Sequence, residues 1–382
     1  MRTFGVEEEF LLIDPTKLCP EPAADAVFLA AGHHDVTREV KQEQIETGTH
    51  PQSSLEELYA DILRHRALAD EAAVRSGVRI AALGTSPIVT GTRVTHETRY
   101  LQMQERFGAT LRDQLTCGCH VHVSVESDEE GVAVLDRIRV WLPVLAALST
   151  NSPFWAGEDS GFASYRGQAW NRWPTAGPCE IFGSAEAYSA LIAQLLATGV
   201  PLDGQAVYFD ARLSTRHPTV EVRVADVCLQ PDDAVLQAAL TRALVETAVR
   251  EWTAGVPPIP MPAAQLRLGC WRASRFGIDG ELLDPLSGTL RDAHELARAL
   301  LEYVRPVLRE QGEDLLVESL LNQVLIRGTG STRQRAVYAR TESLAEVVSD
   351  AVFLTGAGQG SLEERHADSA CFHMRGNELF RI

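Results

Sequence analysis

The sequence contains no Cys-x-x-Cys pair, no block of five or more Lys or Arg residues, and no stretch of about twenty predominantly apolar residues. The first absence excludes the common zinc-ribbon and thioredoxin-like motifs, although seven cysteines occur. Because 52 Asp and Glu residues stand against 35 Lys and Arg residues, no nucleic-acid partner is expected. The third absence argues against a transmembrane helix, so no membrane association is expected.

Targeting and redox signals are also missing. The apolar stretch near the N-terminus is interrupted by Glu7, Glu8 and Glu9, which does not fit a secretory signal peptide. The cysteines follow no disulfide spacing, so we expect reduced thiols and a cytoplasmic location. The 382 residues are 45% hydrophobic and 23% charged, which is typical of a globular protein and does not indicate a function.

The order of predicted elements indicates the fold class. Period-two alternation predicts strands at residues 3–13, 79–83, 118–125, 207–213 and 219–227. Helical spacing predicts helices at residues 54–75, 131–148, 184–198, 232–252, 289–309, 313–326 and 341–355. We therefore expect an α+β fold, an antiparallel sheet covered by helices, in one catalytic domain over residues 1–382. Within it, 1–254 is strand-rich, 255–262 is a proline-rich connector, and 263–382 is mainly helical.

The first predicted strand presents carboxylates on one face. Side chains of a strand alternate, so Glu7 and Glu9 point the same way, about 7 Å apart. Glu8 shares the opposite face with Val6 and Phe10. Two neighbouring carboxylates on an apolar strand repel each other and resist burial, and a divalent cation would resolve both problems. The alternative is an edge strand whose glutamates lie in water.

Two later strands also have one polar and one apolar face. His120 and His122 share a face, which suits one metal ion or phosphate, or two hydrogen-bonded histidines in a polar crevice. Glu221 lies beside Arg223, either as an ion pair or as a metal ligand next to a phosphate clamp. If the three strands share one sheet, their polar groups would line a single surface suited to a polyanion with bound cations.

Two irregular segments are candidates for ligand recognition. Residues 151–183 mix three tryptophans with Arg and Gly and include Arg166, and a loop of that length is usually functional. The alternative is a loop packed on its own aromatic side chains. Residues 327–335, with Arg333 and Arg335, are candidate contacts for nucleotide phosphates, although the Walker spacing is missing.

These motifs together resemble one known family. The segments G-V-E-E-E-F-L-L-I-D, H-V-H-V, N-S-P-F-W-A-G with A-S-Y-R, and T-V-E-V-R-V-A-D occur in the order and at the spacing of the glutamate–cysteine ligase type 2 family, the carboxylate–amine ligase branch. The resemblance runs from Thr3 to about Arg340. It implies a glutamine synthetase-like catalytic fold, in which a curved antiparallel β-sheet forms an active-site funnel covered by helices.

The same resemblance implies roles for individual residues. The implied metal ligands are Glu7, Glu9, Glu46, His120 and Glu221. His120 and His122 would contact nucleotide phosphate, Arg223 would clamp the transferring phosphoryl group, and Arg166 would meet that group or the substrate carboxylate. Ser124 follows H-V-H-V where many members have glycine, so it is expected to narrow the funnel floor or to add a hydroxyl contact.

The implied activity is an ATP- and Mg²⁺-dependent ligation. The γ-phosphoryl group of ATP would pass to a carboxylate, by resemblance that of L-glutamate, and an amine such as cysteine would attack the resulting acyl phosphate. The alternatives are a guanidine or carboxylate kinase of the same fold, a metal-dependent hydrolase using the His-x-His strand, and a nucleotide-binding regulatory module. A homodimer would be an ordinary assembly for such an enzyme.

Overall fold

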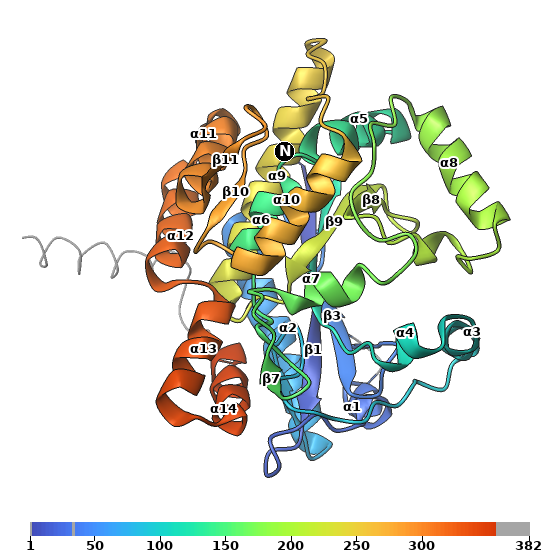
Figure 1. The fold of residues 1–382 in the computed structure, drawn as a ribbon, viewed down its shortest axis with the longest axis vertical. Coiled ribbons are helices and arrows are strands. Elements are labelled where there is room, and N and C mark those ends of the chain that lie inside the picture. Colours follow the sequence, from blue (N-terminus) through green and yellow to red (C-terminus); the bar gives the residue numbers. More distant parts are fainter. Residues whose placement is uncertain (1, 33–34, 357–382) are drawn as a thin grey trace, which may run out of the picture.

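The computed structural model describes residues 2–32 and 35–356. Its centre is a seven-stranded sheet in which every pairing is antiparallel (Figure 1). The strands lie in the order β2 (Thr37–Arg38), β3 (Gln44–Gly48), β1 (Phe4–Ile13), β5 (Gly118–Ser124), β9 (Thr219–Asp226) and β8 (Ala211–Leu213). The seventh strand, β4 (Arg79–Ala81), pairs with the last residues of β1.

Strand β1 is the central element of this sheet. One of its edges pairs with β3, and the other pairs first with β5 and then with β4. The expected alternation is confirmed, because Phe4 and Val6 are buried in the main hydrophobic core whereas Glu7 and Glu9 lie on the opposite face. Glu8 is also buried on the core side.

Two long helices cover the core face of the sheet. Helix α2 (Leu55–Arg75) contacts β1, β3 and β4, and α9 (Pro231–Thr253) contacts β1 and β5. A capping box between Ser54 and Glu57 starts α2, at the position where the sequence predicted the helix to begin. Arg66 of α2 forms a bidentate ion pair with Glu8, with both side chains almost fully buried. The ion pair ties the helix to the central strand.

Further helices surround this layer. The helices α5 (Asp128–Ile138), α6 (Leu142–Leu148) and α7 (Tyr165–Trp170) contact β9, and α10 (Ala263–Phe276) packs on α6 and α7. In Figure 1, α11 (Ala293–Gln311), α12 (Asp314–Arg327), α13 (Gly330–Thr341) and α14 (Leu344–Thr355) form one side of the molecule. On the other side lie α3 (Thr98–Phe107), α4 (Ala109–Arg112) and α8 (Ala185–Ala197), while α1 (Ala24–Ala30) packs on α2. Two small hairpins, β6 (Phe154–Trp155) with β7 (Glu158–Asp159) and β10 (Glu281–Leu283) with β11 (Leu290–Asp292), complete the fold.

The predicted α+β class, with an antiparallel sheet covered by helices, is confirmed. Several local assignments differ: residues 131–148 form two helices instead of one, and 151–183 contains α7 and a hairpin. Strands β2 and β3 and helices α10 and α13 were not predicted. The part after the connector is mainly helical, as expected up to residue 356, and its predicted continuation to 382 lies outside the described residues.

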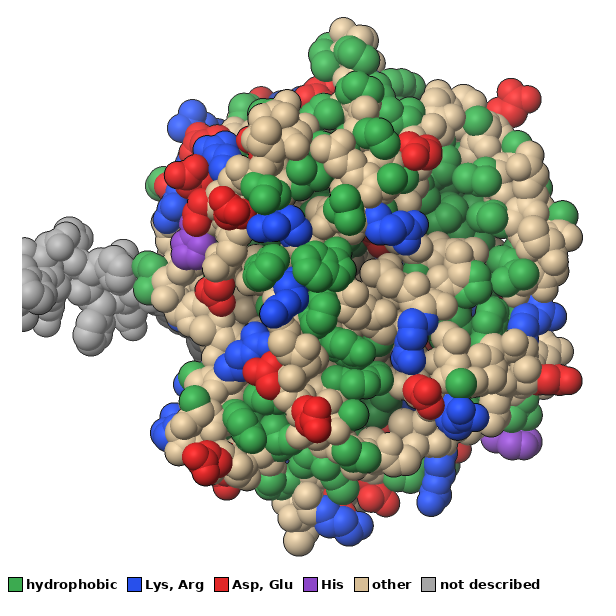
Figure 2. Space-filling view, viewed as in Figure 1, with side chains coloured by type: hydrophobic (Ala, Val, Ile, Leu, Met, Phe, Trp, Pro, Cys, Tyr) green, Lys and Arg blue, Asp and Glu red, His purple; other side chains and the backbone are tan. Residues whose placement is uncertain are grey.

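On the face shown in Figure 2, Lys and Arg side chains are interspersed with Asp and Glu side chains and do not gather in one basic area. Among residues 2–32 and 35–356, no helix combines the length and the apolar character that crossing a bilayer requires.

Candidate active site

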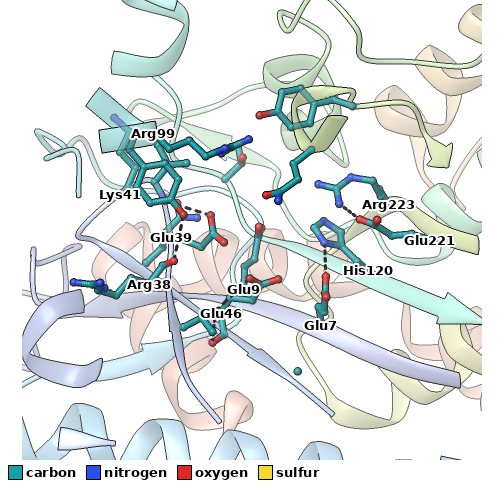
Figure 3. Close-up of a pocket in the computed structure, with 18 of the residues that line it drawn as sticks. Glu7, Glu9, Arg38, Glu39, Lys41, Glu46, Arg99, His120, Glu221 and Arg223 are labelled. Atoms are coloured by element: carbon teal, nitrogen blue, oxygen red, sulfur yellow. Dashed lines mark hydrogen bonds and ion pairs between the residues drawn. The ribbon is translucent and has the colours of Figure 1, made fainter. Parts of the chain in front are cut away.

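The face of the sheet turned away from α2 and α9 forms one wall of a cavity of about 550 Å³ (Figure 3). Four neighbouring strands, β3, β1, β5 and β9, contribute the residues that the sequence singled out. The cavity is lined by Glu7, Glu9, Glu46, His120, His122, Glu221 and Arg223. The structure therefore brings these predicted site residues together on one surface.

Strand register explains why these side chains meet. Glu7 of β1 stands opposite His120 of β5, and Glu9 stands opposite Glu46 of β3. His122 of β5 stands opposite Glu221 of β9. Because residues opposite each other in adjacent strands point to the same face of a sheet, polar residues far apart in the sequence form one continuous row.

Glu7 is the centre of this row. One carboxylate oxygen, Oε2, lies 3.4 Å from Nδ1 of His120, and the other, Oε1, lies 3.3 Å from Nε2 of His122. Glu7 also belongs to two groups of potential metal ligands whose donor atoms lie within 4.8 Å of one another. One is Glu7, His122 and Glu221, and the other is Glu7, Glu46 and His120.

The carboxylates of the cavity differ in their tendency to ionise. Burial raises the pKa of Glu9. It raises the pKa of Glu39 to about 7 and that of Glu46 well above its usual value. Repulsion from neighbouring carboxylates adds to the effect at all three residues. Burial also acts on Glu7, but hydrogen bonds with His120 and His122 outweigh it and hold the pKa of Glu7 well below its usual value. Ionising the whole cluster therefore requires added positive charge.

His120 provides a lone pair for such a charge. Burial and the nearby Arg223 guanidinium lower the pKa of His120 to about 4, so its ring is neutral at neutral pH. Its Nε2 atom is buried and has no hydrogen-bond partner among the described residues. A dense set of carboxylates with a neutral imidazole fits hard divalent cations such as Mg²⁺.

At one end of the cavity, two arginines hold Glu221. Arg212 donates to both oxygens of Glu221, at 2.9 and 3.2 Å, and Arg223 donates to one of them. Burial alone would raise the pKa of Glu221, but the two guanidinium groups lower it. The Nε atom of Arg223 is buried without an acceptor, so this guanidinium has a free donor for an anion. Sequence reasoning missed Arg212.

The opposite end of the cavity is also basic. Figure 3 shows Arg38, Lys41 and Arg99 there, with the carboxylates between them and Arg223. Lys41 is almost fully buried and donates to Thr92 Oγ1 at 2.6 Å, and burial lowers its pKa to about 8. Sequence reasoning missed this group, although Lys41 lies only a few residues before Glu46.

Four other expected contacts are corrected. Arg166 is buried behind the cavity wall, where it donates to the carbonyl of Arg223 at 3.4 Å and leaves no space for a side chain at Gly118. Ser124 does not line the cavity; its hydroxyl accepts from the backbone N–H of Thr3. Arg333 and Arg335 lie on α13 outside the cavity, paired with Asp350 and Asp159 respectively.

A buried carboxylate at the end of β9 positions α7. Asp226 accepts hydrogen bonds from the hydroxyls of Ser152 and Ser164, at 2.7 and 2.8 Å. Ser152 Oγ accepts in turn from the backbone N–H of Arg166, and Ser164 Oγ accepts from that of Gly167. The first turn of the helix that carries Arg166 is therefore fixed to the strand that carries Arg223. Asp226 appeared in the sequence motif, but no pattern indicated this role.

Comparison with solved structures gives the class of the protein first. The glutamate–cysteine ligase of Francisella tularensis, solved in complex with AMP, matches with a TM-score of 0.69 at 14% identity, covering 98% of this chain and 94% of that one. At that identity the likeness shows that the two proteins share a fold.

Sequence comparison then gives the family. The family described as glutamate-cysteine ligase family 2 (GCS2) matches residues 3–352. The chain is 50% identical over 365 residues to the "Putative glutamate--cysteine ligase 2-1" of Paenarthrobacter aurescens, covering 93% of this chain and 95% of the relative. It is 49% identical over 357 residues to the protein of that name in Streptomyces avermitilis, covering 92% and 99%. The chain therefore belongs to glutamate–cysteine ligase family 2 and is an ATP-dependent ligase that forms carbon–nitrogen bonds.

Proposed function

We propose that this enzyme joins a carboxylate, L-glutamate in the first instance, to an amine such as cysteine through an acyl phosphate, using ATP and Mg²⁺. The observation that carries the proposal is the position of Glu7, which belongs to two cation-ligand groups beside the arginine-bound Glu221. A site with several cations and guanidinium groups suits a reaction that brings two anions together.

The residues present fit Mg²⁺. Glu7, Glu46 and His120 would hold one ion, and Glu7, His122 and Glu221 would hold another. Bound Mg²⁺ would supply the positive charge that offsets repulsion between the triphosphate and the substrate carboxylate. It would also relieve the repulsion that raises the pKa of Glu46.

The two basic ends of the cavity support separate roles for anionic groups. Arg223 has a buried Nε donor without a partner among the described residues, and Glu221 holds that guanidinium in place. We assign Arg223 to the oxygens of the transferring phosphoryl group, whose charge a planar fork can meet. At the other end, Arg38 and Arg99 already pair with Asp25 and Asp203. We therefore assign the ammonium of Lys41 to a second anionic group, which an acid with two carboxylates such as L-glutamate would supply.

The proposed reaction has two steps. A substrate carboxylate oxygen attacks the γ-phosphorus of ATP, ADP leaves, and an acyl phosphate forms. The amine nitrogen then attacks the acyl carbon, inorganic phosphate leaves, and the nitrogen loses a proton as the amide forms. No residue of the chain becomes covalently bound in either step, so positioning and charge stabilisation account for the catalysis.

The test is to measure phosphate release from ATP with Mg²⁺, L-glutamate and a panel of amines including cysteine, with amide products identified by mass spectrometry. We expect ADP, phosphate and amide in equal amounts, and only when the acid and an amine are both present. Hydroxylamine in place of the amine should yield a hydroxamate. ATP consumption without an amine, with a phosphorylated product that accumulates, would favour the kinase alternative. Turnover with zinc and without ATP would favour the hydrolase alternative.

A further inference from the structure

A second cluster of metal-binding side chains lies outside the catalytic cavity. Asp61 and His65 are four residues apart on α2 and therefore share a face of that helix. His50 follows strand β3 and faces the same point. The three side chains offer two imidazole nitrogens and one carboxylate oxygen within 4.8 Å of one another, and none of them lines the catalytic cavity.

A cationic group already lies among these three side chains. A terminal nitrogen of Arg64 lies 2.7 Å from Nε2 of His65, 3.3 Å from Nδ1 of His50, and 2.9 Å from Oδ1 of Asp61. Because a guanidinium nitrogen only donates hydrogen bonds, both ring nitrogens must direct lone pairs toward it. The guanidinium thus occupies the position at which a metal ion would meet all three donors.

The surroundings allow an exchange between Arg64 and a metal ion. The Arg64 side chain is 42% exposed, so it can turn into solvent, whereas His65 is only 2% exposed and stays in place. The other oxygen of Asp61, Oδ2, accepts from the backbone N–H of His50 and from the amide of Gln52. These hydrogen bonds orient the carboxylate and leave Oδ1 to face the metal position, as hydrogen bonds to ligating carboxylates do in metal sites.

We propose that His50, Asp61 and His65 form a second metal site, in which a transition-metal ion such as Zn²⁺ competes with the guanidinium of Arg64. Two imidazoles and one carboxylate are a common ligand set for Zn²⁺, whereas each group in the catalytic cavity has two carboxylates and a single imidazole, a harder ligand set that suits Mg²⁺ better. The site therefore differs in selectivity from the carboxylate-rich catalytic cavity. Since His50 follows the strand that carries Glu46, an ion bound there would fix that strand to α2.

The test is titration of the full chain with Co²⁺, followed by its visible spectrum, in the presence of saturating Mg²⁺. We expect one equivalent with a tetrahedral spectrum that Zn²⁺ abolishes. His50→Ala, at an exposed side chain, should weaken binding by about 10- to 100-fold. Arg64→Ala should tighten it, because the competing cation is gone. His96→Ala, at an exposed histidine elsewhere, is the matched control and should bind normally.

Three results would overturn the proposal. The first is no tetrahedral spectrum in the wild-type protein, and the second is binding that neither His50→Ala nor Arg64→Ala changes. The third is loss of the signal in Glu7→Gln, which would assign the ion to the catalytic cavity. Because no turnover is measured, the outcome is independent of the reaction proposed above.

Discussion

Replacing Glu7 with glutamine should nearly abolish ligase activity while the protein stays folded. The change keeps the size of the side chain and removes the charge shared by two groups of cation ligands. Loss of even an outer-shell partner costs roughly 10- to 100-fold in metal affinity, and Glu7 serves two positions. The combined loss should therefore be at least about 10²- to 10⁴-fold, equivalent to roughly 3–5 kcal/mol of transition-state stabilisation.

The adjacent residue supplies the matched control. Glu8 differs from Glu7 only in pointing to the other face of β1, where it pairs with Arg66. Glu8→Gln should cost about 3–5 kcal/mol of unfolding free energy, because it leaves a buried guanidinium unpaired, but folded molecules should keep their kcat. Amide formation against Mg²⁺ concentration, together with urea unfolding, measures both effects. A Glu7→Gln enzyme with wild-type kcat and unchanged Mg²⁺ dependence would show that Glu7 does not bind the cations.

Three further predictions concern other parts of the site. Arg223→Lys should lower kcat by about 10²- to 10³-fold, since an ammonium cannot replace the planar fork beside Glu221; a wild-type rate in the coupled ADP assay would contradict that role. Asp226→Ala should lower kcat by about 100-fold with little change in the KM for ATP, because α7 and Arg166 lose their anchor, and an equal rise in KM would argue against positioning. Glu39 keeps its proton in the folded protein up to a pKa of about 7, whereas the unfolded chain releases it near 4.5. Raising the pH through that window should therefore destabilise the metal-free protein in urea melts, and Mg²⁺ should restore more stability at pH 8 than at pH 5.

Local periodicity was sufficient to predict site residues on strands that bury apolar side chains on one face and present polar side chains to the cavity on the other. The alternation of β1 separated Glu7 and Glu9 from Glu8, and that of β5 placed His120 beside His122, so the cavity residues of these two strands could be named in advance. Strand β3 was missed because its sequence, QIETG, is short and buries a threonine, which weakens the apolar pattern. With β3 unrecognised, Glu39 and Lys41 beside it could not be placed.

Ion pairs between residues far apart in the sequence were the second limit on predicting the site. Arg333 and Arg335 looked available for a nucleotide, but their partners, Asp350 and Asp159, are 17 and 176 residues away. Arg212 and Lys41 do face the cavity, but they were overlooked. The residues next to them in the sequence do not indicate that either side chain belongs to the site. A residue's neighbours in space, which the sequence does not specify, decide whether a guanidinium is available to a ligand.

The placement of β1 between β3, β5 and β4 has a consequence for how the enzyme loses activity. Its backbone amides are bonded along both edges, so they should be among the last to exchange with deuterium. The two glutamates of the reaction centre therefore sit on a segment that opens only when the whole sheet comes apart. Heat or denaturant should inactivate the enzyme in a single cooperative event, with no partly opened form that still catalyses ligation.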